Sequence, residues 1–338
     1  MFTTSYKYSL LLLAFAAGIT LSGCKKDKTV APATITGTWV NAENRFTNPD
    51  YYNFTGDGHM YLLNKTYGGF NRIAESIYSF SGSQLILTDN SSTRLYNTVI
   101  SGDTLFLNDG ASNYRTLLKS PTAPTLADWT TVLTPQQSFI DTLHVTGITF
   151  YNNKIYSFKQ IGGADKLIEF STTLNRVTAI TPSDDTYDGI DFAPDGTLWT
   201  SHWAYAYKFD IATGSQYFQS AATPSSSSAW AVAYGSGKLY ALRGNTISSY
   251  IFNSDSWQTE SNIEISMLTD IAYADGYVYM VADGILYKMV PGNSLPSQTF
   301  YLPNFTLKGI AYAGNGVFWV NGQNRLTSNF EIVKVTIN

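Results

Sequence analysis

Apolar and polar residues alternate in short segments between residues 36 and 120. Leu85 and Leu87 lie two positions apart in one segment, and Leu105 and Leu107 do so in another. Residues with this spacing share one face of a β-strand, so each segment is expected to have one buried face and one solvated face. Glycine-containing turns, such as 56–58 and 81–83, separate the segments and favour hairpins. The predicted strands are 36–40, 51–55, 59–64, 76–80, 84–89, 94–100, 104–108 and 114–119.

This pattern predicts an up-and-down meander of eight strands, which has no free edge if it closes into a barrel. The strands are short, and a barrel of this size can be filled by its own side chains. We favour a filled barrel over a hollow one that holds a small apolar ligand. Two prolines among small polar residues then mark residues 121–127 as a linker after the barrel domain, 36–120.

A second pattern follows the linker and occurs five times. Successive copies start 42, 42, 39 and 39 residues apart, a period typical of propeller blades. Each copy is a strand, a turn with Gly or Asn, and a second strand; a third strand recurs in every unit and a fourth in the first four. The copies are GITFYNNKIY from 147, GIDFAPDGTLW from 189, AVAYGSGKLY from 231, DIAYADGYVY from 270 and GIAYAGNGVFW from 309.

Four strands make one blade, and such blades bury their faces against one another once they form a ring. The chain is therefore predicted to be all-β, with a small eight-stranded barrel followed by a five-bladed β-propeller over residues 128–338. A sixth blade would need strands that the sequence does not show. The fifth unit ends after its third strand, 332–337, and we expect the upstream segment 129–133 to complete that blade.

The amino terminus carries an apolar run from Leu10 to Leu21, about a dozen residues long. A helix that spans a bilayer needs about 20, so the run predicts a secretory signal peptide, residues 1–23, rather than a membrane span. The sequence Leu-Ser-Gly-Cys at 21–24 resembles a bacterial lipobox, which implies cleavage before Cys24 and acylation of its thiol. Cys24 is the only cysteine, so it cannot form an internal disulfide. Residues 24–35 would then be the lipidated cysteine and a tether.

Further resemblances concern the two predicted domains. Gly37-Thr38-Trp39 with the following strand pattern resembles the lipocalin-like domains of bacterial lipoproteins. The repeats are similar to the NHL, YncE-like and gluconolactonase-like propellers of extracytoplasmic proteins, and they lack the Trp-Asp and Gly-His signatures of WD40 repeats. Lysine directly after Cys24 resembles outer-membrane sorting in enteric bacteria. Together these resemblances imply a protein of the cell envelope, held at the outer membrane by lipid on Cys24 and either periplasmic or surface-exposed.

The charge balance narrows the class of partner. The chain has 25 acidic and 21 basic side chains, and charged residues make up 14% of it. It therefore lacks the basic surface that nucleic-acid binding needs, and we expect no nucleic-acid partner.

Propellers of the resembled families place the segments that enter the first strand and leave the second strand of each blade around the mouth of the central channel. The resemblance implies a polar and aromatic ring there, in which Trp203 and Trp230 stack on a sugar or apolar ligand and the polar groups orient it. The alternative is that Trp230 packs between blades and the charges are solvated loop residues. The implied ligand-binding residues are Asp188, His202, Trp203, Trp230, Arg243, Asp270, Asp283, Lys308 and Asn321.

Catalytic patterns are scarce. The three histidines, His59, His144 and His202, have no metal-binding spacing, and we assign no catalytic residue, metal or cofactor. Carboxylates concentrate only at 184–188, where the neighbouring residues favour a surface loop. The leading hypothesis is a non-catalytic binding or scaffolding protein for a glycan or a protein partner. The alternative is a propeller enzyme, a metal-assisted hydrolase or lyase acting on a small sugar-derived substrate.

Overall fold

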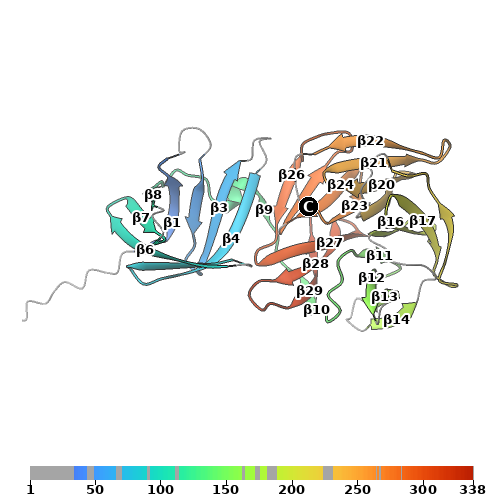
Figure 1. The fold of residues 1–338 in the computed structure, drawn as a ribbon, viewed down its shortest axis with the longest axis horizontal. Helices are drawn as coiled ribbons and strands as arrows, with labels where there is room; N and C mark the ends of the chain where they lie inside the picture. The colour runs from blue at the N-terminus through green and yellow to red at the C-terminus, as the bar shows by residue number, and fades with distance from the viewer. Residues whose placement is uncertain are drawn as a thin grey trace, which may run out of the picture.

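The structure, a computed structural model, consists almost entirely of β-strands in two domains (Figure 1). The barrel lies beside the propeller, with β3 and β4 on the side that faces it. The residues that the structure describes are 34–43, 49–65, 71–89, 92–110, 114–161, 164–171, 176–180, 189–223, 231–263, 265, 268–282 and 284–337.

The first eight strands form a closed antiparallel barrel in chain order, which confirms the predicted meander. Its closure is the pairing of β1 with β8, in which Trp39 lies opposite Lys119. The barrel strands are β1 (Gly37–Asn41), β2 (Tyr51–Phe54), β3 (His59–Lys65), β4 (Asn71–Phe80), β5 (Gln84–Thr88), β6 (Thr93–Ser101), β7 (Thr104–Asn108) and β8 (Tyr114–Lys119).

The side chains expected to face inward do fill the barrel. Leu85, Leu87, Leu105 and Leu107 are all buried in one cluster that also contains Trp39. The Trp39 indole donates a hydrogen bond to the Ile35 carbonyl at 2.7 Å, so the residues before β1 cover one end of the barrel.

Five further sheets make up the propeller, in agreement with the predicted five blades. Blade 1 has β11 (Thr149–Tyr151), β12 (Lys154–Ile161), β13 (Ala164–Ser171) and β14 (Arg176–Ile180); blade 2 has β15 (Gly189–Phe192), β16 (Leu198–His202), β17 (Tyr205–Asp210) and β18 (Ser215–Gln219). Blade 3 has β19 (Ala231–Gly235), β20 (Lys238–Arg243), β21 (Thr246–Ile251) and β22 (Ser256–Asn262); blade 4 has β23 (Asp270–Ala274), β24 (Tyr277–Ala282), β25 (Ile285–Met289) and β26 (Gln298–Tyr301). Blade 5 has β27 (Phe305–Gly314), β28 (Val317–Asn324) and β29 (Phe330–Thr336), completed by β10 (Gln137–Ile140).

The repeated phrase is an inner hairpin in every blade. Its turn is Asn152-Asn153 in blade 1, Ser236-Gly237 in blade 3, Asp275-Gly276 in blade 4 and Asn315-Gly316 in blade 5, and both residues of each turn have positive φ. Two consecutive residues with positive φ are what the tightest β-hairpin turn requires, and Asn, Asp and Gly tolerate this conformation best. The five inner strands contact one another in the order β11, β15, β19, β23, β27 and back to β11, so the ring is closed.

The prediction of the closing strand was wrong in its residues. Segment 129–133 contributes β9 (Thr131–Val132), which pairs in parallel with β26 at the outer edge of blade 4. Blade 5 is completed by β10, where Phe139 lies opposite Ile332 and packs on Trp319 with ring centroids 5.9 Å apart. Thr131 and Val132 are both exposed, whereas Phe139 is buried, so β10 brings the apolar side chain that this blade needs.

The two domains share an apolar core. Tyr61 and Leu63 of β3, with Ile73 of β4, lie in one buried cluster with residues of blades 3 and 4. The short helix α2 (Leu126–Trp129) packs its Trp129 against this cluster, with the ring 6.3 Å from that of Tyr51. The segment after the barrel therefore helps to fix the barrel on the propeller.

Candidate functional site

The antiparallel strand order places two kinds of loop at one end of each blade: the turn from the second to the third strand and the connection to the next blade. We call this end the mouth face. Its described parts are the turns 203–204, 244–245 and 325–329 with residue 284, and the connections 141–148, 220–223 and 302–304 with residues 263, 265 and 268–269.

Trp203 is the most exposed large aromatic residue on the described part of the mouth face, with 65% of its surface accessible. It lies in the two-residue turn between β16 and β17, and its φ is +54°, in the left-handed region that favours glycine. His202 precedes it, and the two rings meet edge-on at 5.8 Å. The chain therefore holds a large apolar ring in solvent at a position where its backbone is strained.

The neighbouring connection 220–223 supports this turn. The Thr223 amide donates to the Ala204 carbonyl at 2.7 Å. Arg243, at the end of β20, donates from Nη1 to the Thr223 hydroxyl at 2.8 Å and is itself buried, which lowers its pKa. The structure thus brings three predicted residues, His202, Trp203 and Arg243, to one area between blades 2 and 3. Thr223, which joins them, was not predicted.

Asp270 and Asn321 are each 1% exposed and lie against the connection 141–148, which enters blade 1. Asp270 Oδ2 accepts from the amides of Ile310 at 2.9 Å and Ile148 at 3.4 Å, and Asn321 Nδ2 donates to the Val145 carbonyl at 2.5 Å. Burial raises the pKa of Asp270 well above its usual range. Both side chains therefore connect blades 4 and 5 to the chain that enters blade 1.

Only glycine fits at position 309, where blades 4 and 5 meet the chain that enters blade 1. A Cβ on it would lie 2.3 Å from both Asn321 Oδ1 and the Thr146 carbonyl oxygen. Of the remaining predicted residues, Lys308 is half-buried at a bulge in β27. Asp188, Trp230 and Asp283, the acidic segment 184–185, Cys24, the signal peptide and the tether up to residue 33 lie outside the described residues.

Asp191 is a half-buried carboxylate between blades that sequence reasoning did not single out. Its Oδ1 accepts from Thr149 Oγ1 of blade 1 and its Oδ2 from the Tyr234 amide of blade 3, both at 2.7 Å. Desolvation by burial raises its pKa to about 6. The signal was present in the repeat, since Asp191 is the only acidic residue at the third position of the five phrases.

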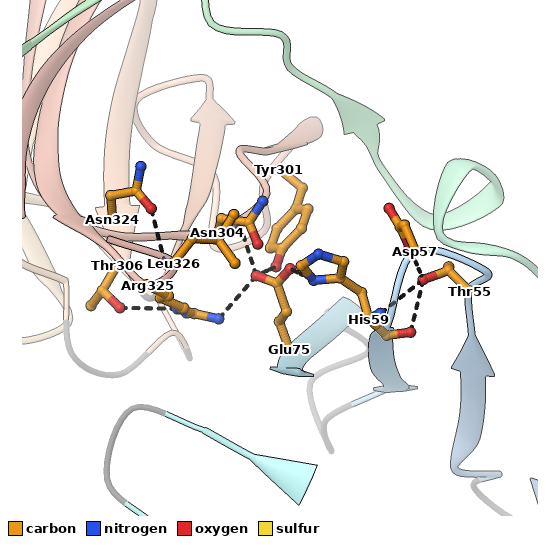
Figure 2. A network of polar contacts seen from close by, with 10 residues as sticks. All are labelled: Thr55, Asp57, His59, Glu75, Tyr301, Asn304, Thr306, Asn324, Arg325 and Leu326. Atoms are coloured by element: carbon orange, nitrogen blue, oxygen red, sulfur yellow. Dashed lines mark hydrogen bonds and ion pairs between the residues drawn. The ribbon is translucent and has the colours of Figure 1, made fainter. Parts of the chain in front are cut away.

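Figure 2 shows a polar network at the junction of the two domains, centred on Glu75 of β4. Glu75 Oε2 accepts from the Tyr301 hydroxyl at 2.6 Å, the Asn304 amide at 3.0 Å and Arg325 Nη1 at 3.1 Å. Its Oε1 lies 3.0 Å from His59 Nδ1. One barrel carboxylate therefore connects two blades of the propeller, and a cavity of about 200 Å³ lies beside it.

The open end of the barrel forms a separate recess of about 650 Å³. Tyr52, Tyr96 and Arg115 line it, and Arg115 Nη1 donates to the Tyr52 hydroxyl at 3.0 Å. Burial raises the pKa of Tyr52. The barrel thus has an apolar interior below a polar, aromatic opening.

The described residues hold no group of three or more His, Cys, Asp or Glu side chains placed to bind a metal ion. In the same ranges, no helix has both the length and the apolar character needed to cross a bilayer.

Comparison with known proteins gives no family. No family model matches the sequence, and no curated protein matches it. Among solved structures, the computationally designed Ika8 protein aligns at 10% identity over 85% of this chain and 93% of its own, with a TM-score of 0.35. U3-55K aligns at 10% identity over 72% of each chain, with a TM-score of 0.36. Similarity at this level carries no argument about function.

Proposed function

We propose that this protein is a non-catalytic binding protein of a bacterial cell envelope, anchored by lipid on Cys24, whose propeller binds a glycan at His202 and Trp203. The observation that carries the proposal is the exposed Trp203 ring in its left-handed turn. A tryptophan at such a position costs solvation and backbone energy without adding to the core. Strained backbone of this kind concentrates at functional sites.

The chemistry around Trp203 suits a sugar ring. The flat indole can stack on the apolar face of a pyranose, as exposed aromatic rings at binding sites do. The His202 imidazole beside it can exchange hydrogen bonds with sugar hydroxyls. Thr223 and Arg243 hold the turn from behind, so the platform is preorganised before a ligand arrives.

The test is glycan binding by the purified full chain, first on an array of envelope and extracellular oligosaccharides and then by titration of the best ligand. Trp203→Ala should weaken binding roughly thirtyfold, the effect of losing a hot-spot residue worth ~2 kcal/mol. Tyr217→Ala is the matched control, because Tyr217 is a 62% exposed aromatic residue on the outer strand of the same blade. Equal affinities for the two variants, or no glycan that binds, would refute the assignment.

The anchor is tested separately. Radiolabelled fatty acid should be incorporated into the wild-type chain and not into Cys24→Ser. A wild-type chain that keeps a free thiol at Cys24 would remove the anchor from the proposal and leave the glycan site standing.

A further inference from the structure

One side of the barrel is an uncharged surface. The outward-facing positions of β5, β6 and β7 alternate with the buried ones and hold neutral residues throughout. We call this surface the uncharged wall; it consists of Gln84, Ile86, Thr88, Thr93, Leu95, Asn97, Val99, Ser101, Thr104, Phe106 and Asn108.

Four apolar side chains stand out from the wall: Ile86 is 37% exposed, Leu95 49%, Val99 61% and Phe106 44%. They form two cross-strand pairs, Ile86 with Leu95 and Val99 with Phe106. The propeller packs on the barrel mainly through β3 and β4 (Figure 1), and of the wall residues only Thr88, at its edge, also lines the cavity at the junction of the two domains. The described part of the chain therefore leaves these four apolar side chains of the wall in solvent.

One end of the wall, with Val99 and Phe106, is at the end of the barrel where the chain from Cys24 arrives. The Ser120 amide donates to the Thr38 carbonyl at 2.9 Å, and the Lys119 amide donates to the Asp103 carbonyl at 2.8 Å. The start of β1 and the turn between β6 and β7 are thus at the same end. Val99 and Phe106 pair two residues before and after that turn.

The length of the tether limits how far this end can be from the bilayer. Thr34 is ten positions after Cys24, and a chain of ten residues spans at most about 35 Å. A lipid on Cys24 therefore keeps the wall within about one barrel length of the membrane surface.

We propose that the uncharged wall is a membrane-contact surface, which lies against the bilayer that holds the lipid of Cys24. The inference rests on the proposed anchor. Its apolar pairs would enter the boundary between headgroups and acyl chains, and the neutral Thr, Ser, Asn and Gln side chains would lie among the headgroups. Because the wall carries no basic residue, contact should depend neither on anionic lipid nor on salt.

The test uses the acylated full chain in neutral phosphatidylcholine vesicles, with a polarity-sensitive fluorophore on one engineered cysteine. Acylation blocks the thiol of Cys24, so Val99→Cys or Phe106→Cys gives a single labelled position. Tyr217→Cys is the control, because Tyr217 is exposed on blade 2, whose strands β16 and β17 lie on the side of the propeller away from the barrel (Figure 1). Labels at 99 and 106 should shift to the blue and be quenched by spin-labelled lipid, and the label at 217 should do neither.

The outcomes separate the candidate occupants of the wall. Emission at 99 and 106 equal to that at 217 overturns the proposal. A blue shift that appears without vesicles and grows with protein concentration assigns the wall to a second copy of the chain and also overturns it. A blue shift with lipid quenching that stays unchanged between neutral and anionic vesicles, and between low and high salt, supports the proposal.

A second arm keeps the inference independent of the anchor. The mature chain, which begins at residue 24 and so lacks the apolar run 10–21, should with Cys24→Ser bind vesicles weakly through the wall alone, and replacing Val99 and Phe106 by Ser in that chain should lower its partition coefficient on the order of tenfold or more. Lack of acylation on wild-type Cys24 together with this wall-dependent binding would refute the anchor only. Acylation together with an unquenched wall would refute the wall only.

Discussion

Glu75 is the best place to test how the two domains are held together. Glu75→Ala removes the carboxylate that accepts three hydrogen bonds and lies 3.0 Å from His59. The side chain of Arg325 is 13% exposed and that of Glu75 is 2% exposed, so the variant leaves a guanidinium in a largely dry site without its carboxylate.

Removing one partner of a buried ion pair costs about 3–5 kcal/mol, because the remaining charge keeps its desolvation penalty. We expect Glu75→Ala to lower the free energy of unfolding by this amount. Glu75→Gln keeps the shape and one acceptor oxygen, and should cost less, roughly 1.5–3 kcal/mol, the value of hydrogen bonds to a charged group. The double variant Glu75→Met, Arg325→Met should recover much of the loss, since apolar replacements of buried ion pairs are often near neutral.

The assay is urea unfolding of the full chain with linear extrapolation, together with calorimetry. Because the network joins the domains, the loss should also separate the barrel from the propeller in the calorimetric trace. Glu43→Ala is the control, since Glu43 is an exposed glutamate of the barrel. A Glu75→Ala chain that unfolds in one transition within ~0.5 kcal/mol of wild type, in the range of ordinary surface substitutions, would refute the reasoning.

Three further predictions concern the propeller. Asp191 has its pKa raised to about 6, so its contribution to stability is complete below its unfolded pKa and is lost as pH rises through 6. Urea unfolding at pH 4 and at pH 7 should therefore show wild type losing roughly 2–3 kcal/mol relative to Asp191→Asn, and a pH-independent difference would contradict this. Gly309→Ala should lower the melting temperature by several degrees, because its Cβ would lie 2.3 Å from a backbone oxygen. Gly56→Ala is the control, since a Cβ there would have nothing within 4 Å. Equal melting temperatures for the two variants would count against the close approach at Gly309. If β10 closes the ring, Phe139→Ala should lower the free energy of unfolding in urea by about 3–5 kcal/mol. Val132→Ala should lower it by less than ~1 kcal/mol, because Val132 is exposed. The reverse order would mean that segment 129–133 closes the ring.

The sequence was a good guide to structure wherever the information is local. Leu85 and Leu87 face the barrel core because side chains alternate along any strand. The inner hairpins formed where Asn-Asn, Ser-Gly, Asp-Gly and Asn-Gly stand, because these pairs accept two positive φ angles in succession. Both properties belong to neighbouring residues, so a single sequence is enough to predict them.

Long-range pairing was harder to predict. Segments 129–133 and 137–140 both have the composition of a short strand, and either could have met the end of the chain. The choice depended on a buried contact between Phe139 and Trp319, residues that lie far apart in the sequence. Alternation along four residues carries no information about such a partner.

The candidate site likewise has residues that could be predicted from the sequence and residues that only long-range packing brought to it. His202, Trp203 and Arg243 were predicted for the mouth face from the repeat geometry of the resembled families. Only the tertiary structure placed Thr223 between them and buried Asp270 and Asn321 against the chain that enters blade 1. Glu75 shows the reason most clearly. Its position on β4 predicts an outward side chain, which water would ordinarily solvate, and only the docking of the propeller replaces that water with Tyr301, Asn304 and Arg325. The order of residues determined which way each side chain points, and the packing of distant segments decided what it meets there.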